Sequence, residues 1–149
     1  MFNGAYLFTQ CACMRSTLGN QTMTNQLKTD DKLLIKQHVL SIVEGLEDGI
    51  TYASCGIDHE EHDADKDDII SGFDYISDVL DIEYTISSEG EYLGARLLVA
   101  FGGPNIWIDT RRQTVEGAWW GDYFTESYHT DAMDIDDACN ELFSCTINI

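Results

Sequence analysis

Acidic side chains are the residues of this chain whose type and spacing could do chemistry. The 149 residues include 27 Asp and Glu against eight Lys and Arg, a formal net charge of -19. Sixteen of these acids lie between Glu44 and Glu91, where Lys66 is the one Lys or Arg. Such a charge repels phosphate backbones and anionic membranes and attracts basic protein surfaces. The composition therefore predicts a basic, nucleic-acid-binding protein as partner, with no direct binding to nucleic acid or membranes.

A predicted helix over residues 67–81 places part of this charge on one side. At 100° per residue, four of its aspartates fall within about 60° of one another, away from the apolar stripe, and form an acidic ridge; they are Asp67, Asp74, Asp78 and Asp81. Adjacent members of this ridge would lie about 4.5–10 Å apart along the axis, a series that resembles the phosphates of one DNA strand. The alternative is a charged face that is only solvated. Reversing Asp74, Asp78 and Asp81 to Lys is expected to abolish partner binding while the domain stays folded.

The aromatic residues after the acidic stretch provide a second candidate contact. Trp119 and Trp120 are neighbours on a predicted strand, so their side chains point to opposite faces. An exposed Trp120 beside Asp122 would be a good anchor in a protein interface; core packing of both Trp residues is the alternative. The complete predicted partner-binding set is Glu60, Glu61, Asp63, Asp65, Asp67, Asp68, Asp74, Asp78, Asp81, Trp120 and Asp122.

A metal site is a competing interpretation of the same acids. Four aspartates occupy the first, third, fifth and last positions of an EF-hand-like frame, where calcium takes oxygen ligands; they are Asp63, Asp65, Asp67 and Asp74. The frame has Asp68 where Gly permits the sharp turn, and it ends in Asp instead of Glu. His59 and His62 are one position too close for the HExxH zinc motif. We therefore predict no metal, and calcium stays open as an alternative.

Motifs of catalysis are missing from the sequence. It contains no GxSxG, no P-loop and no dinucleotide fingerprint, and Gly102-Gly103 precedes a proline and a strand instead of a helix. The chain is therefore expected to be neither an enzyme nor a cofactor-binding protein, with a hydrolase using a carboxylate-bound metal as the remaining enzyme alternative. An odd number of cysteines and the lack of a long apolar run indicate a reduced, cytoplasmic protein.

The elements that must position these residues follow from hydrophobic periodicity. Helical spacing predicts helices over residues 30–46, 67–81 and 132–143. Alternation and turn residues predict strands over residues 82–86, 92–101, 106–109 and 114–120, and residues 123–129 show no clear period. The sequence thus predicts an α+β fold, in which an antiparallel four-stranded meander packs against two N-terminal helices and one C-terminal helix. Residues 23–149 form the expected domain, and residues 1–22 are a poorly ordered extension or an upstream start.

By its size, its charge and its lack of catalytic motifs, the stretch 23–149 resembles the small acidic anti-restriction and anti-CRISPR proteins of phages and plasmids. Several of those proteins imitate DNA. The resemblance implies a stoichiometric inhibitor that occupies the basic channel of a defence nuclease or of a CRISPR or restriction complex. It transfers no site residue to this chain. A toxin immunity protein, which also covers a basic nuclease with an acidic face, is the runner-up, followed by the calcium-binding module.

Overall fold

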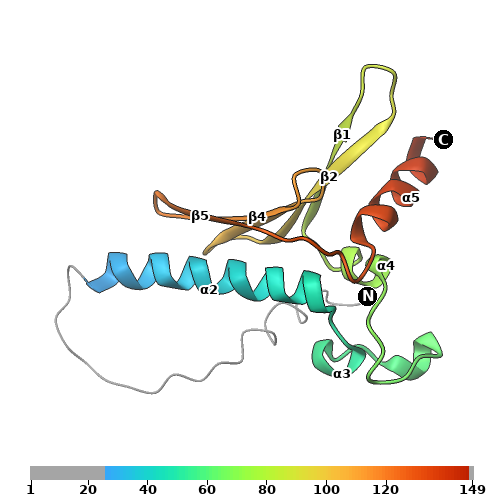
Figure 1. Ribbon diagram of the computed structural model, residues 1–149, viewed down its shortest axis with the longest axis horizontal. Helices are drawn as coiled ribbons and strands as arrows, with labels where there is room; N and C mark the ends of the chain where they lie inside the picture. The colour runs from blue at the N-terminus through green and yellow to red at the C-terminus, as the bar shows by residue number, and fades with distance from the viewer. Residues whose placement is uncertain (1–25, 148–149) are drawn as a thin grey trace.

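The computed structural model describes residues 26–147, arranged as Figure 1 shows. Before the sheet lie the helices α2 (Gln26–Asp48), α3 (Tyr52–Cys55), the 3-10 helix η1 (His59–His62) and α4 (Gly72–Ile76). The strands are β1 (Asp81–Ile86), β2 (Tyr92–Ala100), β3 (Asn105–Asp109), β4 (Thr114–Trp119) and β5 (Asp122–Ser127). Helix α5 (Ile135–Ile147) follows. The extension expected at residues 1–22 lies outside the described residues.

The sheet is an antiparallel meander whose strand order is the order of the sequence. The α+β class and the antiparallel sheet packed under helices are confirmed, but the expectation of four strands was wrong, because the sheet has five. Strand β5 covers the segment without a clear period and pairs with β4. Trp120 and Gly121 join the two strands with φ of 49° and 87°, as a two-residue hairpin turn requires. The partner strand, not local alternation, makes β5 a strand.

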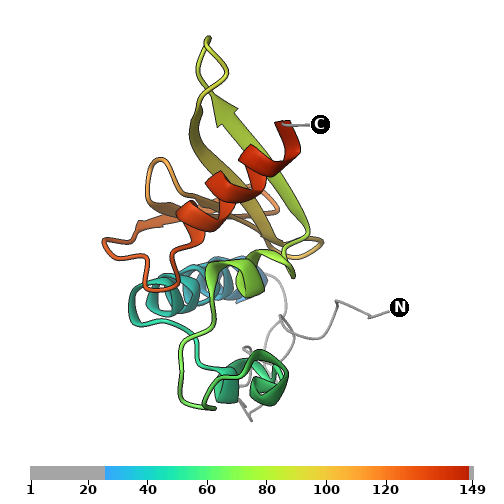
Figure 2. The same ribbon diagram turned by 90° about the vertical axis from the view of Figure 1, so that its right-hand side faces the viewer.

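Both long helices cover the same face of this sheet. The register places Leu97 opposite Ile108 and Ile108 opposite Val115, so these side chains share one face. Helix α2 lies along β4 and β5 on that face, and α5 runs diagonally across it against β2 (Figures 1 and 2). No described helix covers the opposite face. The fold therefore has two layers with one core between them.

Helix α2 packs directly on the backbone of β4. Its inward residues include Ile35 and Val39, which are fully buried. A Cβ atom added to Gly117 would lie 2.7 Å from Ile35 Cγ2 and 2.9 Å from Val39 Cγ2. The absence of a side chain at this position thus sets how closely the helix approaches the sheet.

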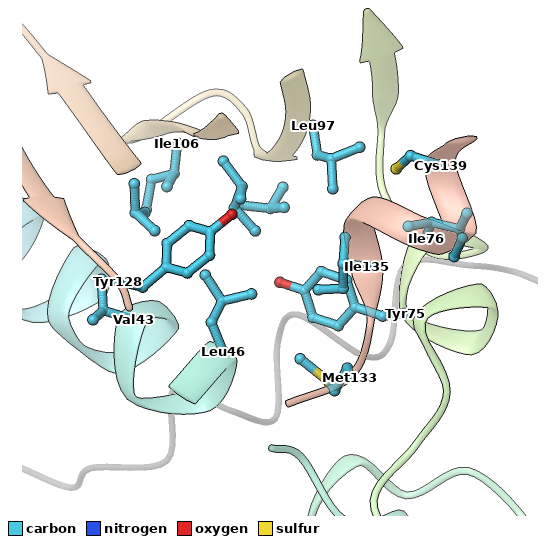
Figure 3. Packing of buried hydrophobic residues seen from close by; sticks show 14 of the residues in the cluster. Val43, Leu46, Tyr75, Ile76, Leu97, Ile106, Tyr128, Met133, Ile135 and Cys139 are labelled. Carbon is cyan, nitrogen blue, oxygen red and sulfur yellow. The ribbon is translucent and has the colours of Figure 1, made fainter. Parts of the chain in front are cut away.

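The core extends from the sheet to the connection that carries the acids. Leu46 of α2, Tyr75 of α4 and Ile135 of α5 are buried close to one another where the three helices converge (Figure 3). Ile70 and Ile76 belong to the same buried cluster. The segment around α4 is therefore fixed against both long helices.

The helix expected over residues 67–81 is wrong, because only Gly72–Ile76 is α-helical. Before it, the chain is extended: Ile70 N donates to Ile50 O over 2.8 Å, and Thr51 and Ile69 form an antiparallel bridge. After it, Leu80 N donates to Leu98 O over 2.8 Å, the start of the β1–β2 pairing. Backbone hydrogen bonds to distant segments thus replaced the helical ones, although the apolar residues recur at helical spacing.

The candidate partner-binding surface

The acidic loop, residues 57–71, presents seven exposed carboxylates on an anchored backbone. Asp58 caps η1 by accepting from Glu60 N over 3.0 Å, and Asp68 Oδ2 accepts from Asp65 N over 2.9 Å. Ala53 N donates to Lys66 O over 2.8 Å, which ties the loop to α3. The exposed acids of the loop that were predicted to bind a partner are Glu60, Glu61, Asp63, Asp65, Asp67 and Asp68.

Asp74 is a structural carboxylate and not a member of an exposed ridge. Its Oδ2 accepts from Ser71 Oγ over 2.8 Å, from Ser71 N over 3.3 Å and from the Tyr52 hydroxyl over 3.1 Å. His62 Nδ1 lies 3.4 Å from Asp74 Oδ1. Burial first, and then the bond to Asp74, raise the pKa of Tyr52, so its hydroxyl remains the donor. Asp74 therefore completes the capping box that Ser71 begins at α4, and it joins this helix to α3 and to the acidic loop.

Asp78 and Asp81 likewise do not belong to a helical acidic ridge. Asp78 is half-buried, its Oδ2 lies buried without a hydrogen-bond partner among the described residues, and burial raises its pKa. Asp81 is exposed at the start of β1, and its Oδ1 accepts from Ile82 N over 2.9 Å. Because α4 ends before both residues, the regular helical series of Asp67, Asp74, Asp78 and Asp81 does not form.

An acidic groove lies where α4 meets α5, and its volume is about 410 Å³. Its lining residues come from two stretches of chain; they are Ile69, Ile70, Ser71, Gly72, Phe73, Ala132, Met133, Asp134, Asp137, Ala138 and Glu141. Ile69 and Phe73 remain 44% and 45% exposed there. Sequence reasoning missed this site, although Asp134, Asp137 and Glu141 recur at helical spacing beside the predicted inner face of the last helix.

Close backbone contact determines the shape of this groove. A Cβ atom added to Gly72 would lie 2.6 Å from Asp134 O and 2.8 Å from Met133 O. Ala132 N also donates to Leu46 O over 2.9 Å. The loop before α5 is therefore held between α4 and the end of α2.

Helix α5 is oriented by one of its own acids. The Tyr92 hydroxyl donates to Asp136 Oδ1 over 2.7 Å, and Asp136 N donates to Asp131 Oδ2 over 3.1 Å. Asp136 thus points toward the sheet, while Asp137 and Glu141 stay exposed.

Trp120, in the β4–β5 turn, and Asp122, the first residue of β5, lie at the other end of the molecule, far from the acidic loop (Figure 1). Trp120 is 83% exposed, and its ring centroid lies 5.6 Å from that of Trp119. At the same end of the sheet Phe101 and Tyr123 are also exposed. The predicted partner-binding set is therefore divided between an acidic end and an aromatic tip, formed by Phe101, Trp119, Trp120 and Tyr123.

The arginines of the sheet lie away from the acidic groove, on the face without a helix. The Arg96 guanidinium is 3.5 Å from Glu83 and 3.4 Å from Glu116, and it covers the Trp107 ring at 4.7 Å from its centroid. Arg112 lies 3.8 Å from both Asp109 and Glu116. Because neighbouring carboxylates neutralise these guanidinium groups, they do not reduce the net negative charge at the acidic end.

The four carboxylates of the calcium frame do not converge. Within residues 26–147, no group of three or more His, Cys, Asp or Glu is placed to hold a metal ion. Asp74 is engaged by Ser71 and Tyr52, whereas Asp63, Asp65 and Asp67 are exposed along the loop. His59 Nδ1 lies 3.1 Å from Ala64 O, and His62 faces Asp74. The arrangement thus offers charge and apolar contact, not a coordination shell.

None of the described helices has the length and apolar character needed to cross a membrane. Comparison with known proteins finds no matching family model, no similar curated protein and no similar solved structure.

Proposed function

We propose that this protein is a stoichiometric acidic inhibitor that acts in the cytoplasm on a basic nucleic-acid-binding protein, such as a defence nuclease or a CRISPR or restriction complex. The observation that carries the proposal is the concentration of exposed carboxylates at one end of the fold. The acidic loop contributes seven, and Asp134, Asp137 and Glu141 add three more beside it. Lys66 is the one Lys or Arg in the loop.

Such a surface acts first on the rate of association. Fields of one sign steer an oppositely charged partner and raise the association rate, and the effect decreases with ionic strength. Salt of about 0.15 M limits the range of exposed charges to about 8 Å, so contact at close range must supply the remaining affinity. DNA mimicry, as part of this proposal, rests on the loop carboxylates, since the helical series is replaced by a short α4 and a strand.

Capture of the partner at two salt concentrations tests the function. The tagged protein is incubated with host lysate at low and at high salt, and the recovered proteins are identified by mass spectrometry. We expect a nuclease or a DNA- or RNA-binding complex that is released by salt, and that loses its activity when the purified protein is added in equimolar amount.

Charge-reversal variants connect the capture to the acidic loop. Glu60→Lys, Glu61→Lys and Asp65→Lys together should abolish it, because each change removes one exposed negative charge and adds a positive one. Glu89→Lys with Glu91→Lys, in the exposed β1–β2 turn, is the control for charge changed elsewhere. Equal loss in both variants, or a captured protein without a nucleic-acid-binding surface, contradicts the proposal.

A further inference from the structure

We infer that the acidic groove is the docking site for a basic peptide segment of the partner, which inserts one apolar side chain against Ile69 and Phe73 while its Lys or Arg residues meet the carboxylates of α5. The inference rests on the proposed function and specifies its contact. A groove of about 410 Å³ lies within the range of about 300–1,000 Å³ that small ligand sites occupy. It therefore fits a side chain or two of a partner, not a folded domain.

The apolar part of the contact is already formed. Ile70 and Met133 are buried and lie in the floor of the groove, whereas Ile69 and Phe73 project beside them and stay almost half exposed. Covering apolar surface yields roughly 25 cal/mol per Å². A large apolar side chain from a partner would therefore gain stabilisation here that the folded chain alone does not obtain.

The charged part of the contact is unpaired. Asp134, Asp137 and Glu141 are exposed, and among the described residues no side chain forms an ion pair or a hydrogen bond with their carboxylates. No Lys, Arg or His belongs to the described lining of the groove. The helix dipole favours Asp137 in the first turn, but it is weak by Glu141. These charges are thus complementary to a cationic segment.

The spacing of the carboxylates fits an extended cationic chain. At about 1.5 Å per residue, Asp137 and Glu141 are separated by roughly 6 Å along α5. Alternate side chains of an extended peptide project to the same side, about 6.6 Å apart. Two basic residues that flank one position of a strand-like segment can therefore reach both carboxylates.

The groove is also preorganised for binding. The Gly72 backbone abuts the carbonyls of Met133 and Asp134, and Ser71 with Asp74 forms a capping box at the start of α4. A site that is rigid before binding loses little conformational freedom when a ligand arrives. The cost of ordering then falls on the incoming segment alone.

A synthetic peptide probes the site without the natural partner. The full chain is titrated into a fluorescein-labelled peptide in which one Leu is flanked on each side by Arg residues, and the Kd is measured by fluorescence anisotropy. The matched peptides replace Leu by Ser or every Arg by Glu. We expect each replacement to weaken binding by about tenfold or more, which corresponds to about 1.4 kcal/mol. Equal binding of the Leu and Ser peptides would overturn the inference.

Variants of the protein locate the binding site. Phe73→Ala should raise the Kd for the peptide with Leu flanked by Arg by about tenfold, and so, separately, should Asp137→Lys with Glu141→Lys. The controls are Ile86→Ala, an exposed apolar residue of β1, and Glu89→Lys with Glu91→Lys, which changes the charge equally. Circular dichroism verifies that each variant is folded. The changes in NMR chemical shift that the peptide causes in the wild-type chain locate the site even if a variant unfolds. Shifts outside residues 69–73 and 132–141 would contradict the assignment.

The same variants separate this inference from the proposed function. If the groove variants still capture the nucleic-acid-binding partner while the acidic-loop variant does not, the groove inference is wrong and the proposed function stands. If the peptide maps to the groove but the lysate provides no such partner, the proposed function fails and the groove remains a site for basic segments.

Discussion

The Tyr52 hydroxyl donates a 3.1 Å hydrogen bond to Asp74 Oδ2, so one carboxylate joins α3 to α4. The two residues are 22 positions apart, and the same oxygen accepts from Ser71. An aspartate that a sequence pattern places on an exposed ridge is thus part of the framework that carries the acidic loop. This relationship changes what a charge reversal at Asp74 tests.

Replacing Asp74 should destabilise the fold. Asp74→Ala removes the acceptor of the partly buried Tyr52 hydroxyl and one half of the capping box of α4, and we expect the free energy of unfolding to decrease by about 1–3 kcal/mol. Urea denaturation followed by circular dichroism measures the change. Asp81→Ala, at an exposed position, should stay within about 0.5 kcal/mol of wild type. Equal effects of the two substitutions would contradict the structural role, and reversing Asp74 together with Asp78 and Asp81 should unfold the domain before it tests binding.

Asp78 should make stability depend on pH. Burial raises its pKa in the folded state. The folded chain then binds more protons at this group than the unfolded chain, so its contribution to stability falls as pH rises through the ordinary aspartate range near pH 4. Asp78→Asn removes the charge, and its Tm relative to wild type should be higher at about pH 7 than at about pH 4.

The control for this pH effect is Asp81→Asn, which removes a charge of the same type at an exposed position. Both variants reduce the general repulsion of the acidic chain by the same amount. A pH-dependent difference in Tm between the two variants therefore reports the burial of Asp78, and identical pH profiles would refute it.

Gly117 should not tolerate a side chain. Its added Cβ would lie 2.7 Å from Ile35 Cγ2, so Gly117→Ala must push α2 away from the sheet. Overpacking of this kind costs about 1–3 kcal/mol, which a thermal melt detects as a lower Tm. Ala118→Val enlarges the adjacent residue, which is exposed on the same strand, and it should leave the Tm nearly unchanged. A Gly117→Ala variant as stable as wild type would show that α2 does not pack here.

Trp120 stays a predicted anchor for the partner, and Asn is the substitution that isolates this role. Trp120 has a φ of 49° in the hairpin turn, and Asn-Gly is the preferred pair for such a turn. Trp120→Asn should therefore leave the fold intact and weaken partner capture by tenfold or more, the loss of about 1.4 kcal/mol or more expected for a Trp hot spot.

A double variant tests whether the two ends of the molecule act independently. Figure 1 shows the β4–β5 turn far from α4 and α5, between which the acidic groove lies, so the losses of binding free energy from Trp120→Asn and from the groove variant should add. Unchanged capture by Trp120→Asn would remove the aromatic tip from the binding surface.

Most of the element boundaries were predictable because local pattern and final structure agree there. The inward residues of α2 recur at helical spacing, and the alternation from Ile82 to Trp119 matches β1 to β4 within a residue or two. Strand β5 was not predictable, since its conformation depends on hydrogen bonds from β4. The segment from Asp67 to Asp81 shows the opposite case. Its apolar residues recur at helical spacing, but backbone hydrogen bonds to Ile50 and Leu98 hold its two ends in extended conformation.

The sequence by itself determined the net charge, the concentration of acid near the acidic loop, the α+β class and the faces of the long helices, because these depend on composition and on neighbours along the chain. Only the tertiary structure decided which acids remain available to a partner. Packing partly buried Asp78 and placed Asp74 in hydrogen bonds with Tyr52 and Ser71. It also brought Phe73 beside Asp137 and Glu141, which lie more than sixty positions later in the chain. Contacts between such distant segments depend on how helices dock against one another, and no local spacing encodes them.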